Sequence, residues 1–497
     1  MKILLVHPHY PDTFWSFRNA LNFISKKAIV PPLGLITVSA MLPASWEKRL
    51  VDLNVAALKS KDIEWADMVF ISAMNVQKDS VETIIHECGK HKVTVVAGGP
   101  LFTQEYHSFE KIDHFILNEA EVTLPLFLKD LEEGHPQKIY KTSGFPEIGA
   151  SPIPDFHLLS KKNYQSMNVQ VSRGCPFSCE FCEITTLLGH KVRMKSTAQI
   201  LGEFEKLYDL NWFGNIFIVD DNFIGNKKIL KNELLPAIKK WSEERNNPFT
   251  FNTEVSIDLA DDEELLSLMV ETKFKSVFIG IESPEESSLQ ECNKIQNRNR
   301  DLLKSVEKIQ NAGIEVSGGF IVGFDSDSPT VFQRQIDFIQ KSGIVTAMVG
   351  LLNAPKNTKL YDRLKSEKRI VSEFNGNNTD MYINFIPRMY YPELISGYRK
   401  IIREIYSTKP YYKRIRKLLL NYKYRYSRPF SINLAHLKAL IKSIFIIGIL
   451  NKGRSDYWKL VFWTLFKRPS LMGDAITYAI YGYHYRIVYG LSNKDKQ

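Results

Sequence analysis

Long apolar runs and cysteine are both scarce in this sequence. The longest uncharged apolar run, Ser443 to Leu450, is far below the roughly 18 residues that a membrane-spanning helix needs. The apolar stretch after Met1 is too short for a signal peptide and is placed like a first buried strand. Five cysteines, three of them clustered, do not form a paired disulfide framework. We therefore expect a cytoplasmic protein in which the cysteine cluster binds metal.

The sequence also lacks repeats, low-complexity tracts and a common nucleotide-binding fingerprint. No G-x-G-x-x-G follows the first expected strand, which disfavours an ordinary nicotinamide or flavin domain. At 497 residues the chain is too long for one hydrophobic core, so two or three domains are expected. We place their boundaries from the order of short apolar runs and helical patterns along the chain.

The first 140 residues alternate between short β-branched runs and helical patterns. Such alternation is typical of a doubly wound α/β domain with a parallel sheet, and its ligands lie beyond the carboxyl ends of the strands. Gly98 and Gly99 lie at such an end and allow close approach of a ligand, although a glycine pair is as often simply a turn. The expected strands are 2–7, 48–54, 68–74, 93–99 and 113–118, and the clearest helices are 33–42 and 80–90.

A Pro- and Gly-rich stretch, 141–164, indicates an interdomain linker, and a second β/α series follows over 165–370. Six β/α units predict a partial barrel, with its chemistry at the carboxyl ends of the strands. The expected strands lie at 167–174, 215–222, 249–258, 276–283, 315–324 and 346–354.

The cysteine cluster directly follows the first barrel strand. Cys175, Cys179 and Cys182 have the spacing C-x3-C-x2-C. Structural zinc normally takes four protein ligands, and His190 as the fourth would make an unusual set. A [4Fe-4S] cluster held by three thiolates leaves one iron open. Three unrelated buried cysteines are the third alternative.

This spacing, with aromatic Phe181 just before the third cysteine, resembles the radical S-adenosylmethionine (radical SAM) superfamily. The resemblance implies that the open iron chelates SAM, whose reductive cleavage gives a 5′-deoxyadenosyl radical. It also implies SAM-binding residues at the other strand ends. The residues so assigned are Asp220, Asp221, Asn222, Glu254, Glu282, Gly319 and Gly323. Each of them has a plainer alternative as a turn or a helix cap. Arg193 is expected either to meet a carboxylate or phosphate or to be a surface cation.

The order of the domains extends the resemblance to the cobalamin-binding radical SAM subfamily over residues 1 to about 370. The fold so implied is α/β: a doubly wound, cobalamin-binding parallel sheet in 1–140, then a partial (β/α)6 radical SAM barrel in 165–370. The D-x-H-x-x-G motif that ligates cobalt in many cobalamin proteins is absent, and His7 and His9 do not reproduce it. The lower axial ligand of cobalt therefore stays unassigned.

The subfamily implies a [4Fe-4S] cluster, SAM and cobalamin as cofactors, and an electron donor such as flavodoxin or ferredoxin. Its members include methyltransferases that act on unactivated carbons, which polar displacement cannot methylate, and oxidative cyclases. We expect a C-methyltransferase with a hydrophobic small-molecule substrate. The alternatives are a cyclase with the same cofactors and a non-catalytic cobalamin sensor, which would need no cysteine cluster.

The region 371–497 is expected to be helical, basic and aromatic. The net charge of +10 arises here, because residues 401–497 carry nineteen Lys or Arg against four Asp or Glu. The region resembles the tails of hopanoid C-2 methylases and bacteriochlorophyll side-chain methylases. We expect peripheral contact with the inner face of a membrane, with Tyr457, Trp458 and Trp463 at the interface, and no nucleic-acid partner. A packing layer with a solvated basic face is the plainer alternative.

Overall fold

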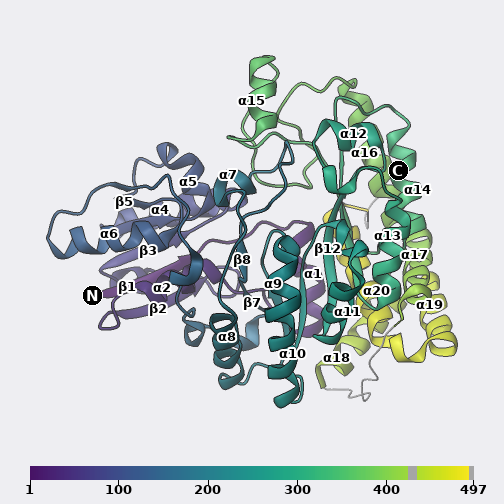
Figure 1. The fold of residues 1–497 in the computed structure, drawn as a ribbon, viewed down its shortest axis with the longest axis horizontal. Helices are drawn as coiled ribbons and strands as arrows, with labels where there is room; N and C mark the ends of the chain where they lie inside the picture. Colours follow the sequence, from purple (N-terminus) through teal and green to yellow (C-terminus); the bar gives the residue numbers. More distant parts are fainter. Residues whose placement is uncertain (424–433, 492–497) are drawn as a thin grey trace.

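The computed structural model describes residues 1–423 and 434–491, apart from the side chains of 434–436. Figure 1 shows a first α/β domain on one side, a second β/α unit in the middle, and a layer of helices against the far side of that unit. This order along the chain is the one that the sequence predicts.

The first sheet is entirely parallel, in the order β2-β1-β3-β4-β5-β6. Alternate residues of β1 enter two separate cores, with Leu4 and Val6 in one and Ile3 and Leu5 in the other. Both faces of the sheet are therefore covered, and the doubly wound arrangement is confirmed. The strands are β1(Lys2–His7), β2(Glu47–Asp52), β3(Met68–Ser72), β4(Thr94–Gly98), β5(His114–Ile116) and β6(Ile139–Tyr140). The covering helices are α2(Leu33–Met41) and α6(Ala120–Glu132) on one face and α3(Ser60–Trp65), α4(Lys78–His91) and α5(Pro100–Glu105) on the other.

The second sheet is the predicted six-stranded partial barrel, in the parallel order β7-β10-β11-β12-β13-β14. One expected strand, 167–174, is divided. Its second part is a short strand, β8(Ser172–Arg173), that turns away to pair with β9(Arg193–Met194) and carries the cysteine loop. The barrel strands are β7(Met167–Val169), β10(Gly214–Ile218), β11(Phe249–Glu254), β12(Phe274–Glu282), β13(Glu315–Val322) and β14(Ala347–Leu351). The helices between them include α8(Thr197–Asp209), α10(Leu235–Glu244), α11(Glu263–Glu271), α12(Glu286–Glu291), α13(Leu302–Ala312) and α14(Val331–Ser342).

The segment after β1 leaves its own domain and packs beside the barrel. Its helix α1(Arg18–Leu21) contacts α20(Met472–Val488), and the ring of Phe14 stacks on Tyr485 with centroids 4.3 Å apart. Figure 1 shows α1 among the elements of the barrel. Because Phe14 and Phe23 are buried in the core of the barrel and the C-terminal helices, this segment fastens the first domain to the rest of the molecule.

The C-terminal region is helical, as predicted, and shares one continuous core with the barrel. The hydroxyl of Tyr406 donates to the carbonyl oxygen of Ala347 in β14 at 2.6 Å, and Tyr398 donates to that of Val349 at 3.1 Å. None of the described helices is both long and apolar enough to cross a bilayer. The other helices of this region are α15(Lys359–Ser366), α16(Tyr391–Tyr406), α17(Thr408–Asn421), α18(Leu434–Ser443), the π-helix Ile444–Leu450 and α19(Arg454–Lys467).

Candidate functional site

The three clustered cysteines lie on one loop between β8 and α7(Ile184–Leu188), at the carboxyl end of the first barrel strand. Gly174 opens this loop with a φ of +92°, and a Cβ atom there would stand 2.6 Å from the carbonyl oxygen of Lys191. The loop therefore requires glycine at this position. All three cysteines are half-buried and free of disulfides.

The cysteine loop is held by the segment that follows α12. The backbone N–H of Glu180 donates to the carbonyl oxygen of Cys292 at 2.9 Å, and the side-chain amide of Asn293 donates to that of Ser178 at 3.0 Å. The amide of Gln296 lies 3.9 Å from the Sγ of Cys179. Cys292, far from the cluster in sequence, thus supports the loop through its backbone while its own thiol is buried.

The three thiols are a donor set that fits an iron–sulfur cluster with one open iron. With Zn–S bonds of about 2.3 Å, the sulfurs of a tetrahedral zinc site lie roughly 4 Å apart. Among the described residues, the one group of three ligand atoms mutually within 4.8 Å belongs to Asp130, Glu133 and His135 and includes none of these cysteines. That the cysteines bind a cluster stays a prediction.

Two half-buried carboxylates lie near the cysteine loop without a hydrogen-bond partner among the described residues. Burial, reinforced by the charge of Asp221, raises the pKa of Glu254 at the end of β11 to about 8. Burial and the charge of Asp220 raise the pKa of Asp221 to about 7. The charge of Asp221 in turn contributes to raising the pKa of the Cys175 thiol. In the part of the chain that the structure describes, neither side chain accepts a hydrogen bond from another residue. They are therefore available to a cationic or hydroxyl-bearing ligand.

Two neighbours of these carboxylates are engaged within the protein. The carboxylate of Asp220 accepts hydrogen bonds from the backbone N–H of Val171 at 2.7 Å and the hydroxyl of Ser172 at 2.6 Å. The side-chain oxygen of Asn222 accepts one from the N–H of Ser256 at 3.1 Å. Both residues hold the strand ends in place, so a direct role in binding SAM stays a prediction.

Glu282, at the end of β12, is paired with a buried lysine that the sequence did not single out. Its carboxylate lies 2.7 Å from the Nζ of Lys294, and their side chains are only 8% and 12% exposed. Burial by itself would lower the pKa of Lys294, but the charges of Glu282 and Cys179 raise it above its ordinary value. Lys294 therefore places a positive charge near this carboxylate and the cysteines, where it opposes the rise that burial causes in the pKa of Cys175 and Cys182.

The two glycines assigned to β13 and its end are required by the local geometry. A Cβ atom at Gly319 would stand 2.8 Å from the ring of Phe278, and Gly323 has a φ of +108°. Close packing and a left-handed backbone therefore explain both glycines. Their proposed contact with SAM stays a prediction.

The carboxyl edge of the first sheet carries an apolar pocket. A Cβ atom at Gly98 would stand 2.8 Å from the carbonyl oxygen of Ile116, and Gly99, with a φ of +92°, lies against Ser72. Cobalamin at this edge would therefore approach the backbone closely without displacing side chains. The pocket is lined by the two glycines together with Leu35, Val38, Phe70, Val96, Ile116 and Leu124.

His7, at the end of β1, is half-buried, and desolvation lowers the pKa of its imidazole. Its Nδ1 atom has no hydrogen-bond partner within the described chain. His9 also has a lowered pKa because of burial. The carboxylate of Asp52, at the end of β2, is already bonded to the hydroxyl of Tyr164 at 2.9 Å.

A buried ion-pair network joins the two α/β domains. The carboxylate of Glu119, just beyond β5, lies 2.7 Å from Arg193 and 2.6 Å from Arg173, which directly precedes the cysteine loop. Arg173 also pairs with Glu121 at 2.7 Å. Arg193, which the sequence assigned to a carboxylate or phosphate, therefore meets a carboxylate. The network places the carboxyl edges of both sheets on the same interface.

Comparisons with known proteins agree with this arrangement. Residues 21–128 match the family model described as B12 binding domain, 169–339 match that of the Radical SAM superfamily, and 358–497 match a domain of unknown function, DUF4070.

Full-length relatives are similar throughout. The chain is 41% identical over 493 residues to an uncharacterised methyltransferase of Synechocystis sp., covering 98% of this chain and 91% of the relative. It is 31% identical over 494 residues to a hopanoid C-2 methylase of Rhodopseudomonas palustris, covering 95% and 90%. The cobalamin-dependent S-adenosylmethionine radical enzyme OxsB superposes with a TM-score of 0.62 at 14% identity, covering 99% of this chain and 80% of OxsB.

Proposed function

Because the chain belongs to the cobalamin-binding radical SAM family, we propose that it transfers a methyl group to an unactivated carbon of a hydrophobic, lipid- or pigment-like substrate. Its cofactors are a [4Fe-4S] cluster, SAM and cobalamin. The full-length relatives, an uncharacterised methyltransferase and a hopanoid C-2 methylase, support methyl transfer over other reactions of the family.

The observation that carries this proposal is the grouping of three thiols, two free carboxylates and one buried lysine at the edge of the barrel that meets the first domain. When bound, the cluster with SAM supplies hydrogen abstraction and cobalamin supplies the methyl group. The protein's own residues hold and orient these cofactors. Cys175, Cys179 and Cys182 bind the cluster. Glu254 and Asp221 accept hydrogen bonds from the polar groups of SAM.

A tryptophan from the first domain supports an apolar substrate. Trp15 is 39% exposed, yet its indole N–H lies 3.0 Å from the sulfur of Met348 in β14. Its ring stands edge-on to Phe278 of β12, with centroids 5.3 Å apart. Apolar side chains of the first domain and of the barrel thus meet, and a partly exposed tryptophan there suits a flat or polycyclic hydrocarbon face.

The experiment compares lipid and pigment extracts of cells with and without the gene by mass spectrometry. Methyl transfer predicts a product heavier by one CH2 that disappears with the gene. Oxidative cyclisation, the alternative with the same cofactors, predicts a product lighter by hydrogen. No difference in either extract would contradict a lipid or pigment substrate. A purified protein that binds cobalamin but never cleaves SAM would instead support a sensor.

The cluster also requires a one-electron donor, and we propose a small redox protein such as flavodoxin or ferredoxin. The test is anaerobic reduction of the cluster by each purified donor, followed by its absorbance. A cluster that neither donor reduces would contradict this partner.

We further propose that the C-terminal helices dock on the surface of a membrane. These helices carry seven exposed apolar side chains, Ile441, Phe445, Ile449, Leu450, Phe462, Leu465 and Phe466, which are 48% to 78% exposed. Lys438, Lys459 and Lys467 lie on the same helices, and cations near an anionic bilayer contribute on the order of 1 kcal/mol each. Tyr457, expected at the interface, is instead buried with its hydroxyl 2.9 Å from that of Ser443.

Trp458 and Trp463 are half-buried and stay candidates for the interface, whereas residues 424–433 and 492–497 of the basic region 371–497 lie outside the described residues. The test is cosedimentation with anionic and neutral liposomes. Phe466→Asp is expected to abolish most binding, and Phe213→Asp, which changes an equally apolar exposed side chain on the barrel, to leave it intact. Equal binding of both variants, or no binding by the wild type, would contradict the docking surface.

A further inference from the structure

The region of unknown function, residues 358–497, begins with helix α15, which contacts the cysteine loop. The N–H of Leu360, in the first turn of α15, donates to the carbonyl oxygen of Glu180 at 3.0 Å. The Nζ of Lys359 lies 2.6 Å from the hydroxyl of Ser178. The guanidinium of Arg363 binds the carboxylate of Glu180 with both oxygens, at 2.7 and 3.1 Å. Glu180 stands between two of the predicted iron ligands, Cys179 and Cys182.

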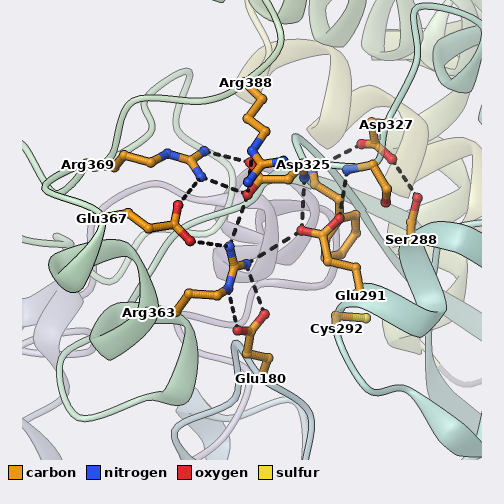
Figure 2. Close-up of polar contacts among 12 residues, drawn as sticks. Glu180, Ser288, Glu291, Cys292, Asp325, Asp327, Arg363, Glu367, Arg369 and Arg388 are labelled. Atoms are coloured by element: carbon orange, nitrogen blue, oxygen red, sulfur yellow. Dashed lines mark hydrogen bonds and ion pairs between the residues drawn. The ribbon is translucent and has the colours of Figure 1, made fainter.

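Arg363 also reaches the loop that follows β13. Figure 2 shows its guanidinium between Glu180 and Asp325, which it contacts at 3.0 Å. Asp325 is fixed in turn by Arg369, with both of its oxygens bound at 2.6 and 2.7 Å. One arginine therefore ties the cysteine loop to the end of the strand that carries Gly319 and Gly323.

The charges around Arg363 make it more than a surface ion pair. The side chains of Glu180, Glu291 and Asp325 are only 10% to 16% exposed, and all three carboxylates lie within 3.6 Å of its guanidinium. Without this cation, the carboxylates of Glu180 and Glu291 would have no ion-pair partner among the described residues, whereas Asp325 would keep Arg369. Repulsion between these two carboxylates would push the cysteine loop away from α12, and the tie to the loop after β13 would be lost.

We propose that Arg363 is a positioning residue for the iron–sulfur cluster, and that the region of unknown function is needed to retain the cluster because it supplies this residue. The side chain of Arg363 does not bind iron; it fixes the backbone between Cys179 and Cys182. This proposal rests on the cluster and not on methyl transfer. It would therefore hold whatever the substrate proves to be.

The experiment uses full-length holoprotein with Arg363→Met and Arg363→Lys. Arg300→Met is the matched control, because Arg300 binds Asp261 with both oxygens at 2.8 and 3.1 Å but does not touch the cysteine loop. Three quantities are measured: the rate of iron transfer to a chelator, the electron paramagnetic resonance spectrum of the reduced cluster with and without SAM, and the absorbance of bound cobalamin.

Arg363→Met is expected to release iron about tenfold faster and to shift the g-values of the reduced cluster, since loss of a charge-assisted bidentate contact has about this effect. Arg363→Lys keeps the positive charge but cannot make the bidentate contact. Its rate of iron release should therefore fall between those of Arg363→Met and the wild type. Glu180→Gln is expected to add little to Arg363→Met, because the two residues act as a pair.

Unchanged cobalamin absorbance in Arg363→Met would show that the variant is folded and would assign the effect to the cysteine loop. The proposal is overturned if Arg363→Met and Arg300→Met release iron at the same rate. The proposal is also overturned if the reduced clusters of Arg363→Met and Arg300→Met both have the g-values of the wild type. Should Arg363→Met fail to fold, the milder Arg363→Lys and Glu180→Gln decide by the same two measurements.

Discussion

Replacing Glu254 by glutamine should stabilise the protein without its ligands and weaken its binding of SAM. The carboxylate is half-buried at the end of β11, and desolvation together with the charge of Asp221 raises its pKa from 4.5 to about 8. Glutamine has nearly the same shape and no ionisable group. The substitution therefore removes the cost of the buried acid together with the negative charge that would meet SAM.

The size of the effect follows from the pKa. A tenfold change in proton affinity corresponds to about 1.4 kcal/mol, so the raised pKa destabilises the folded state by on the order of 3 kcal/mol at about pH 7. Because the folded pKa is the higher one, stability is complete below about pH 4.5, the ordinary value, and falls as the pH rises towards 8. The Glu254→Gln variant should lack this decline.

The assay is urea unfolding of ligand-free wild type and Glu254→Gln across this pH range, with Glu307→Gln, an exposed position on α13, as the control. SAM affinity, measured on reconstituted protein under anaerobic conditions, should fall about ten- to hundredfold, as expected for loss of a hydrogen bond to a charged group. Equal pH profiles of the wild type and Glu254→Gln, combined with unchanged SAM affinity, would refute both the raised pKa and the assigned role.

Three other sets of substitutions test separate parts of the site. Cys179→Ala should lose the broad thiolate-to-iron absorbance and SAM cleavage, whereas Cys88→Ala and Cys292→Ala should keep both, since Cys292 supports the loop only through its backbone; SAM cleavage by Cys179→Ala would contradict the cluster ligands. Glu119→Gln should destabilise the interface by about 3 to 5 kcal/mol in urea unfolding, because it leaves the buried charge of Arg193 without its ion-pair partner. Lys191→Met at the exposed Lys191–Glu147 pair should cost less than about 1 kcal/mol, and equal costs would refute the interface. His7→Ala and His9→Ala should leave the absorbance of bound cobalamin unchanged, and a shift with either would identify a protein ligand of cobalt.

The sequence predicted the two sheets well because strand periodicity is a local property. Each of the six expected barrel strands overlaps an observed strand, and the alternation of Ile3, Leu4, Leu5 and Val6 between two cores is what a doubly wound sheet requires. The loop carrying Cys175, Cys179 and Cys182 was also predictable, because its spacing and its glycine are local.

The supporting residues were not predictable because their partners are distant in the sequence. Arg363 contacts Glu180 across 183 positions, and Arg193 meets Glu119 across 74. Lys294 is only 12 positions from Glu282, but the two are brought together by the turn of the chain after β12 and not by any local periodicity. Nor does periodicity reveal that the segment carrying Phe14 leaves its own domain, since its apolar residues would suit either core. The cysteine ligation and the SAM contacts of Glu254 and Asp221 stay predictions that the proposed substitutions test.

The most direct measurement supplies SAM with a deuterated methyl group to anaerobically reconstituted, reduced protein that contains cobalamin. We expect that 5′-deoxyadenosine forms, that the deuterated methyl appears on bound cobalamin, and that Cys179→Ala abolishes 5′-deoxyadenosine. A protein with a complete reduced cluster and bound cobalamin that forms no 5′-deoxyadenosine and leaves the cobalamin unlabelled would contradict it.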